Sequence, residues 1–223
     1  MNSKYKVLKY RSNNTNELED LISIEEPLEI TIKFKNKETW IENTISVTMR
    51  TPGNDEDLVR GFLYNERIIE KIEYIDKIKS VGEKVGQYNL KNKIVVTINN
   101  SENVDIDKIK RNFLTNSSCG VCGKTSLDSL EIIKKDKIVK SLPKIDHEII
   151  MKSPTTLRKN QSEFSKTGGI HASGLFSDKG NVVAIKEDVG RHNALDKLIG
   201  YVLEKKLLNP SSQFLACSGR LNF

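Results

Sequence analysis

Apolar and polar residues alternate in two neighbouring stretches of the first fifty residues, and this period of two predicts β-strands in the N-terminal part. Residues 28–34 (LEITIKF) alternate apolar and polar side chains, and residues 40–49 (WIENTISVTM) continue the alternation after a short turn. Such alternation places one apolar face of each strand against a core. A third strand is predicted within residues 89–99 (NLKNKIVVTIN).

A helix is predicted directly after the second strand, where a proline and a glycine interrupt the alternation. Asn54 is a candidate N-cap, and the three acidic residues at 55–57 complement the positive end of a helix dipole. Leu58 and Phe62 supply an apolar stripe at helical spacing. Residues 1–110 are therefore predicted to form a β-rich N-terminal part with one helix.

Residues 111–223 are predicted to form an α/β core. A hairpin is expected over residues 171–187, followed by a helix that begins at Arg191 and by a strand near residues 213–217. A strand, a helix and a strand in this order predict a parallel βαβ unit. A longer polar helix before the hairpin is expected to be interrupted near Pro154. The fold class is thus α/β, with helices on a mixed sheet.

The charge of the chain is positive but dispersed. The sequence carries 36 Lys and Arg against 30 Asp and Glu, a net charge of +6. Nucleic-acid-binding proteins cluster their cations and place aromatic residues among them, whereas the lysines here are interleaved with acidic residues. The pattern disfavours nucleic acid as a partner and leaves open an anionic small molecule or an acidic partner surface.

The sequence predicts a cytoplasmic protein without membrane contact. No segment approaches the ~20 apolar residues of a membrane-spanning helix, and the N-terminal residues are too polar for a signal peptide. Three cysteines, an odd number in a chain of 223 residues, fit a reducing compartment better than a disulfide framework.

Cys119 and Cys122 form a C-x-x-C pair in the glycine-rich stretch SSCGVCGK. A structural zinc site needs four ligands, and neither Cys217 nor the three histidines supply a second close pair, so no permanent metal is expected. A dithiol redox pair is one alternative, and a thiolate that carries sulfur as a persulfide is another. The spacing alone does not separate these from two ordinary loop cysteines.

Three clusters of glycine with polar or basic residues lie at the ends of predicted strands. They are TGGIHASG (167–174), EDVGRHN (187–193) and CSGR (217–220). In the second cluster Arg191 and His192 stand at a helix N-terminus, where backbone amides attract anions. Together the clusters predict a pocket for an anionic ligand. The alternative, a capping Asp188 before a solvated first turn, stays open.

Five strings carry a resemblance to a known family. They are MRTPGNDEDLVRGFLYNERII, SSCGVCGK, TGGIHASGLF, VGRHNALDKLIG and CSGRLNF, in this order from Met49 to Phe223. A C-x-x-C alone is a weak signal, but its combination with R-H-N-A-L-D-K and T-G-G-x-H-A is highly specific. The chain thus resembles the formate dehydrogenase accessory sulfurtransferase family, FdhD/NarQ.

The resemblance implies a sulfurtransferase. Family members take sulfur from a cysteine desulfurase and deliver it to the molybdenum cofactor (Mo-bis-molybdopterin guanine dinucleotide), which then enters formate dehydrogenase. By the same resemblance Cys119 bears the persulfide and Cys122 assists, in a homodimer whose core is similar to cytidine deaminase. The residues then expected to bind the cofactor phosphates are Arg191, His192, Ser218 and Arg220.

Two further expectations follow at this point. Family members continue past the S-G-R-x-x-F string, so the C-terminal elements of the family are expected to be missing here. Two other functions remain compatible with the residues: a non-enzymatic cofactor-binding chaperone, and a dithiol oxidoreductase that cycles the Cys119–Cys122 pair.

Overall fold

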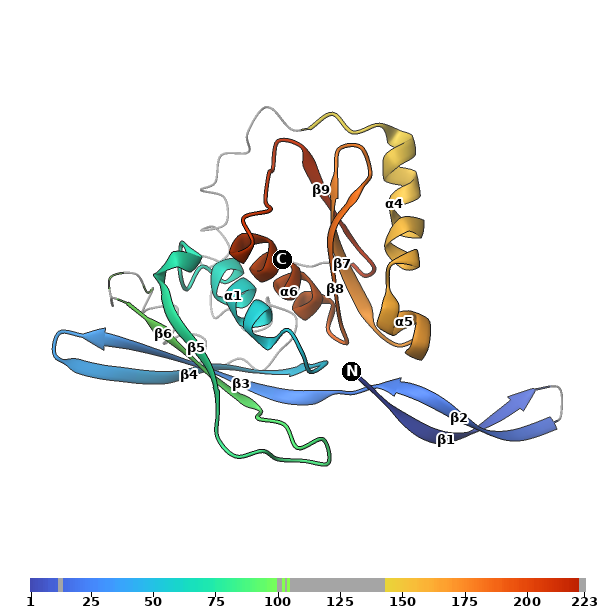
Figure 1. Cartoon of the computed structure of the whole chain (residues 1–223), viewed down its shortest axis with the longest axis horizontal. Coiled ribbons are helices and arrows are strands. Elements are labelled where there is room, and N and C mark those ends of the chain that lie inside the picture. The colour runs from blue at the N-terminus through green and yellow to red at the C-terminus, as the bar shows by residue number, and fades with distance from the viewer. Residues whose placement is uncertain (12–13, 100–101, 103, 105–142, 221–223) are drawn as a thin grey trace.

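The part of the chain that the structure describes contains three sheets and four α-helices (Figure 1). This computed structural model describes all residues except 12–13, 100–101, 103, 105–142 and 221–223. The elements are β1 (Asn2–Arg11), β2 (Asn14–Ser23), β3 (Glu26–Asn36), β4 (Thr39–Arg50), α1 (Asp55–Asn65), the 3-10 helix η1 (Ile72–Tyr74), β5 (Ile75–Val81), β6 (Lys93–Ile98), α4 (His147–Lys159), α5 (Ser162–Thr167), β7 (His171–Ser177), β8 (Val182–Asp188), α6 (Arg191–Glu204) and β9 (Gln213–Cys217). The predicted α/β class is confirmed, while the likeness to a cytidine deaminase core stays a prediction.

The N-terminal part is built on a four-stranded sheet in the order β4-β3-β6-β5. β3 and β4 form the predicted antiparallel hairpin, and β6 lies parallel to β3 on its other side. Ile30, Ile32 and Phe34 are fully buried on the face that packs against α1. The edge strand β5 was not predicted, because its sequence IDKIKSV is too polar to alternate clearly.

α1 begins where the sequence predicts, but Asn54 does not cap it. Asn54 adopts a left-handed backbone conformation with φ 57°, and its side chain makes no capping hydrogen bond. Its Oδ1 instead accepts a hydrogen bond of 2.6 Å from Lys186 Nζ on β8. The start of α1 is therefore tied to the C-terminal part of the chain rather than closed locally.

The C-terminal part holds a three-stranded sheet in the order β8-β7-β9. β7 pairs antiparallel with β8, as the predicted hairpin requires, and antiparallel with β9 on its other edge. β8 and β9 therefore run in the same direction, but β7 lies between them. The predicted strand–helix–strand unit therefore has its two strands parallel, but they do not pair with each other, because β7 lies between them.

α4 runs without interruption through Pro154, contrary to the sequence prediction. A proline in a helix leaves the carbonyl four residues earlier without its N–H partner. That carbonyl belongs to Ile150, and the Ser153 hydroxyl donates a hydrogen bond of 2.8 Å to it. The side chain of the neighbouring residue thus replaces the lost backbone bond.

β1 and β2 form a hairpin that was not predicted and that extends away from the rest of the molecule (Figure 1). Its strands carry opposite charges, and Lys4 and Lys6 pair across the hairpin with Glu19 and Glu17 at 3.3 and 3.4 Å. Each strand alone is polar and carries little alternation, so the pairing becomes visible only when the two strands are placed together.

The two parts of the chain meet where α1 packs against α6 (Figure 1). Each helix presents a glycine at the contact: a side chain on Gly61 would collide with the carbonyl of Asp196, and one on Gly200 with the carbonyl of Asp57. Only glycine lets the two backbones approach this closely. The predicted boundary between residues 110 and 111 lies outside the described residues.

Gly61→Ala and Gly200→Ala are each expected to lower the free energy of unfolding by roughly 1–3 kcal/mol, because the added methyl group forces the helices apart. Urea denaturation measures the change. Gly169→Ala is a matched control, since the nearest atom to its new methyl group lies 3.9 Å away. A Gly61→Ala protein as stable as this control would contradict the close helix contact.

Candidate functional site

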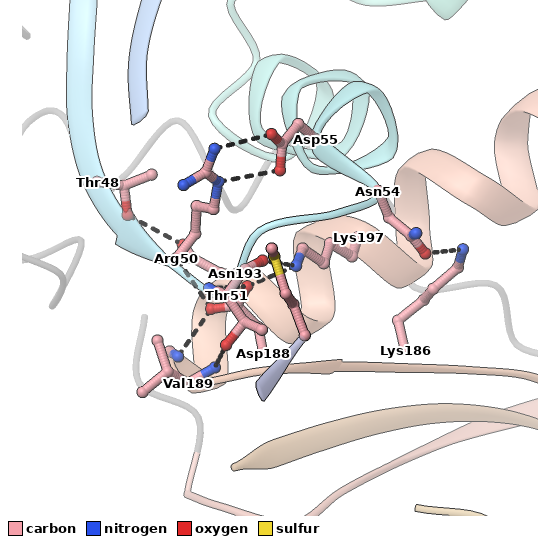
Figure 2. A network of polar contacts seen from close by, with 12 residues as sticks. Thr48, Arg50, Thr51, Asn54, Asp55, Lys186, Asp188, Val189, Asn193 and Lys197 are labelled. Atoms are coloured by element: carbon pink, nitrogen blue, oxygen red, sulfur yellow. Dashed lines mark hydrogen bonds and ion pairs between the residues drawn. The ribbon is translucent and has the colours of Figure 1, made fainter. Parts of the chain in front are cut away.

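Asp188 lies at the centre of a buried polar network where β8 leads into α6 (Figure 2). Its side chain is 0% exposed. Oδ1 accepts hydrogen bonds from Gly190 N at 2.9 Å and Asn193 Nδ2 at 3.2 Å. Oδ2 accepts one from Thr51 N at 3.1 Å and lies 2.7 Å from Lys197 Nζ. Both oxygens are therefore fully satisfied, as a buried carboxylate requires.

The same network holds the segment that follows β4 against the first turns of α6. Val189 N donates to Thr51 Oγ1 at 3.1 Å, and Lys197 Nζ donates to the Thr51 carbonyl at 2.7 Å. Asn193 Nδ2 donates to the carbonyl of Met49 at 2.7 Å. Two of the family strings, MRTPGNDEDLVRGFLYNERII and VGRHNALDKLIG, are thus in direct contact although they stand far apart in the sequence.

Arg50 extends the network to the start of α1. It is 1% exposed, and its guanidinium forms a two-point ion pair with Asp55 at 3.0 and 2.9 Å. Two further bonds of 3.2 Å reach the carbonyl of Glu26 and Oδ1 of Asn92. This arginine therefore ties the end of β4 to the neighbouring elements of the N-terminal part.

Sequence reasoning assigned no role to Arg50, Thr51 or Lys197. One signal was present: Lys197 stands between Ala194 and Leu198 on the stripe of α6 that is buried. A lysine on an apolar helix face needs a buried partner, and Asp188 is the carboxylate that supplies it. The interpretation of Asp188 as a simple helix cap therefore describes only part of its bonding.

The structure brings the three predicted strand-end clusters together. Ser218 Oγ, directly after β9, accepts a hydrogen bond of 2.9 Å from Ala172 N and lies 3.3 Å from His171 Nδ1. A side chain added at Gly219 would lie 3.1 Å from the His171 ring and 3.5 Å from Arg191 Cδ. Polar groups from β7, α6 and the segment after β9 thus surround one position.

The remaining predicted residues lie beside this position in the chain. His192 is the second residue of α6 and is partly buried, and Arg220 is exposed at the end of the described residues. Arg191 is partly buried, and its Nε has no hydrogen-bond partner among the described residues. The binding of an anion by these residues stays a prediction.

The predicted sulfur-carrying pair, Cys119 and Cys122, lies outside the described residues. The third cysteine, Cys217, ends β9 and is half-buried, and Ser173 Oγ donates a hydrogen bond of 3.4 Å to its sulfur. Burial raises the pKa of the Cys217 thiol, an effect that the Ser173 bond only partly opposes. Within the described residues, no three His, Cys, Asp or Glu side chains gather as metal ligands.

No helix of the described part is both long and apolar enough to span a membrane. Among the described residues, parts of four family strings meet near the N-terminus of α6, those that begin at Met49, Thr167, Val189 and Cys217. This arrangement defines a protein of mixed α/β architecture with a buried polar network at the start of α6.

Comparison with known proteins shows the family. The model of the FdhD/NarQ family matches residues 23–223. A Picrophilus torridus protein named "Sulfur carrier protein FdhD" is 46% identical over 204 residues, which cover 92% of this chain and 72% of that protein. A Sulfolobus acidocaldarius protein of the same name is 37% identical over 220 residues. These residues cover 99% of this chain and 77% of that protein. The chain therefore belongs to the FdhD/NarQ family.

A solved structure shares the fold. It is the crystal structure of a Desulfotalea psychrophila protein described as a formate dehydrogenase accessory protein, with a TM-score of 0.65 at 20% sequence identity. The similarity covers 98% of this chain and 75% of that protein. At this identity the likeness supports the fold alone.

Lys197→Met is expected to lower the free energy of unfolding by roughly 3–5 kcal/mol, because it leaves the buried Asp188 carboxylate without a counterion. Urea denaturation checks this value. Lys205→Met, just beyond the end of the same helix and exposed, is the control and should change stability little. Adding Asp188→Asn to Lys197→Met should recover part of the loss, and a double variant less stable than the single would contradict the ion pair.

The charge of a second carboxyl at the junction, that of Asp196, changes near neutral pH. Burial raises the pKa of Asp196 to about 7, and the nearby Glu66 and Asp188 carboxylates add to the rise. A hydrogen bond of 2.6 Å from Asn65 Nδ2 opposes it. The folded chain therefore keeps this proton over a range in which the unfolded chain, with a pKa near 3.8, has released it.

It follows that Asp196 lowers stability progressively as the pH rises from about 4 to about 7. Asp196→Asn is expected to raise the free energy of unfolding at pH 8 and to leave it nearly unchanged at pH 4. Urea denaturation at both pH values measures the difference. The same change at both values would show that Asp196 is not protonated in the folded chain at neutral pH.

Proposed function

We propose that this protein is a sulfur carrier in formate dehydrogenase maturation, with Cys119 as the residue that holds the sulfur. The observation that carries the proposal is the 46% identity, over nearly the whole chain, to a protein named as a sulfur carrier. The C-x-x-C pair in SSCGVCGK supplies the thiols that such a role needs.

The sulfur enters as a persulfide from a cysteine desulfurase. The Cys119 thiolate attacks the terminal sulfur of the desulfurase persulfide. A new S–S bond forms on Cys119 while the old one breaks, and its electron pair leaves on the desulfurase thiolate. The terminal sulfur keeps its proton, so the step neither consumes nor releases an oxidant.

Cys122 can then release the sulfur. Its thiolate attacks the Cys119 sulfur, which forms a Cys119–Cys122 disulfide and frees hydrosulfide for the acceptor. The carried sulfur gains two electrons, and the two thiols supply them. A dithiol reductant must reduce the disulfide before the next cycle. These reaction steps give the second thiol, three positions after Cys119, a role in sulfur release.

Cys217 is a poor candidate for the same role. Its raised pKa keeps the thiol protonated at neutral pH, and its hydrogen bond to Ser173 holds it against β7. A persulfide carrier needs a thiolate that two partners can reach. The properties of Cys217 therefore support the C-x-x-C pair as the carrier.

The substrate proposed for the delivered sulfur is the molybdenum cofactor in its bis-molybdopterin guanine dinucleotide form. Arg191 offers a buried N–H donor at the start of α6, where the helix dipole also attracts phosphate. Ser218 precedes Gly219, at which an added Cβ would lie 3.5 Å from Arg191 Cδ, and Arg220 and His192 are neighbours of these residues in the chain. We propose formate dehydrogenase as the recipient of the loaded cofactor and a homodimer as the assembly.

Cys119→Ala is expected to abolish sulfur loading without loss of the fold. Mass spectrometry after incubation with a cysteine desulfurase and cysteine measures a one-sulfur mass increase on the Cys119 peptide. Cys122→Ala should still load but release its sulfur slowly, and Cys217→Ala, the matched control, should behave as the unaltered chain. Loading of the Cys119→Ala protein at the normal rate would exclude Cys119 as the carrier.

A further inference from the structure

One face of the four-stranded sheet is left uncovered by the described helices. Figure 1 shows α1 and α6 on the same side of this sheet. The residues of the opposite face follow from the strand register, in which β3, β4, β5 and β6 each contribute alternate side chains. This face, called the outer face below, is formed by Pro27, Glu29, Thr31, Lys33, Lys35, Trp40, Glu42, Thr44, Val47, Met49, Lys77, Lys79, Val81, Lys93, Val95 and Thr97.

The outer face is strongly cationic. Its lysines come from three neighbouring strands and are Lys33, Lys35, Lys77, Lys79 and Lys93. Glu42 is a carboxylate of this face, Lys35 is paired with Glu38 at 3.3 Å, and Glu29 is paired with Lys93 at 2.9 Å. That lysine lowers the pKa of Glu29. Within the described residues no ion pair holds Lys33, Lys77 or Lys79, so their charges are available to a partner.

An apolar stripe borders these lysines along β4. Trp40, Val47 and Met49 are 53%, 52% and 50% exposed, and the strand register places all three on the outer face. Lys33 Nζ lies 5.3 Å from the centre of the Trp40 ring, which joins the stripe to the cationic group. Exposed apolar side chains beside like charges are typical of a protein-binding surface.

We propose that the outer face docks the acidic surface of the protein that donates sulfur to this chain. The proposal rests on the sulfur-carrier function proposed above. Loading transfers sulfur between two protein thiols, so the donor protein must bind this chain. Delivery passes the sulfur to a small molecule, for which the cluster around Arg191 is the candidate site. The three lysines that no described carboxylate pairs with, Lys33, Lys77 and Lys79, select a partner of opposite charge.

Other occupants fit the outer face less well. A second copy of this chain also carries a net charge of +6 and would place cations near cations. A single-stranded nucleic acid would use aromatic rings on which bases stack. Only Trp40 among the residues of this face is aromatic, while Val47 and Met49 are aliphatic. An acidic protein with apolar residues among its carboxylates matches both features of the face.

The outer face is also connected to the candidate site. Met49 exposes its side chain on this face, and its carbonyl accepts the hydrogen bond from Asn193, two residues after Arg191. β4 then passes directly into Arg50 and Thr51 of the buried network. A protein bound along β4 would therefore lie next to the elements that hold the start of α6.

The test compares two triple variants of the whole chain with equal charge changes. Lys33→Glu, Lys77→Glu and Lys79→Glu alter the outer face, and Lys159→Glu, Lys179→Glu and Lys205→Glu alter exposed lysines of the C-terminal part. Sulfur loading of Cys119 is followed by mass spectrometry from two donors, a cysteine desulfurase with cysteine and inorganic polysulfide. Polysulfide supplies the same sulfur atom without protein docking.

The outer-face variant is expected to load at least tenfold more slowly from the desulfurase than the control variant does, and equally fast from polysulfide. Its loading should also depend less on salt, since docking has lost its electrostatic component. If urea denaturation shows that the glutamate variant does not fold, the same three lysines are replaced by glutamine and the same comparison applies.

Three results would overturn the proposal. Equal loading of the two variants from the desulfurase, with the unaltered chain loaded by both donors, would remove the docking face and leave the sulfur-carrier function intact. Failure of the unaltered chain to load from either donor would overturn the carrier function and this proposal with it. The outer-face variant could also load normally from the desulfurase but lose the binding of a labelled RNA oligonucleotide. That result would assign the face to nucleic acid instead.

Discussion

The ion pair between Asp188 and Lys197 is the interaction on which the arrangement of the chain depends. Both side chains are excluded from water, at 0% and 3% exposure, so each charge must be compensated inside the protein. The compensation includes the backbone of Thr51, which comes from the other part of the chain. The network can therefore form only when the segment after β4 lies against α6. The same contact fixes the position of the start of α6, beside β7 and the end of β9.

Close packing of α1 on α6 makes that contact possible. Glycines at 61 and 200 allow backbone atoms of the two helices to touch, which brings the start of α1 beside β8, where Lys186 bonds to Asn54 and Asp57. The same packing covers one face of the four-stranded sheet and leaves the lysines and the β4 stripe on the other. One helix pair thus joins the two parts and separates a candidate small-molecule site from a candidate protein surface.

Elements whose period is local could be predicted from the sequence. The hairpin of β3 and β4, the helices α1 and α6 and the hairpin of β7 and β8 all follow from alternation or helical spacing within a single stretch. The pairing of β1 with β2, the place of β9 beside β7 and the Asn54 bond each depend on a partner that no periodicity reveals. The helix through Pro154 depends instead on a local bond, from the Ser153 hydroxyl to the carbonyl of Ile150. In the candidate site, Arg191 and Ser218 were singled out because they are polar groups at strand ends, whereas Arg50, Thr51 and Lys197 were not.

The sequence by itself determined the types of most elements, the family strings and the C-x-x-C pair, because these are properties of neighbouring residues. Only the tertiary structure decided that Asp188 is a shared buried acceptor, with a donor at Thr51 that stands 137 positions away. It also decided that lysines from three strands gather on one face, since strand order and register, not spacing along the chain, bring them together. A buried charge finds whichever partner the folded chain places beside it, and that choice is made by packing.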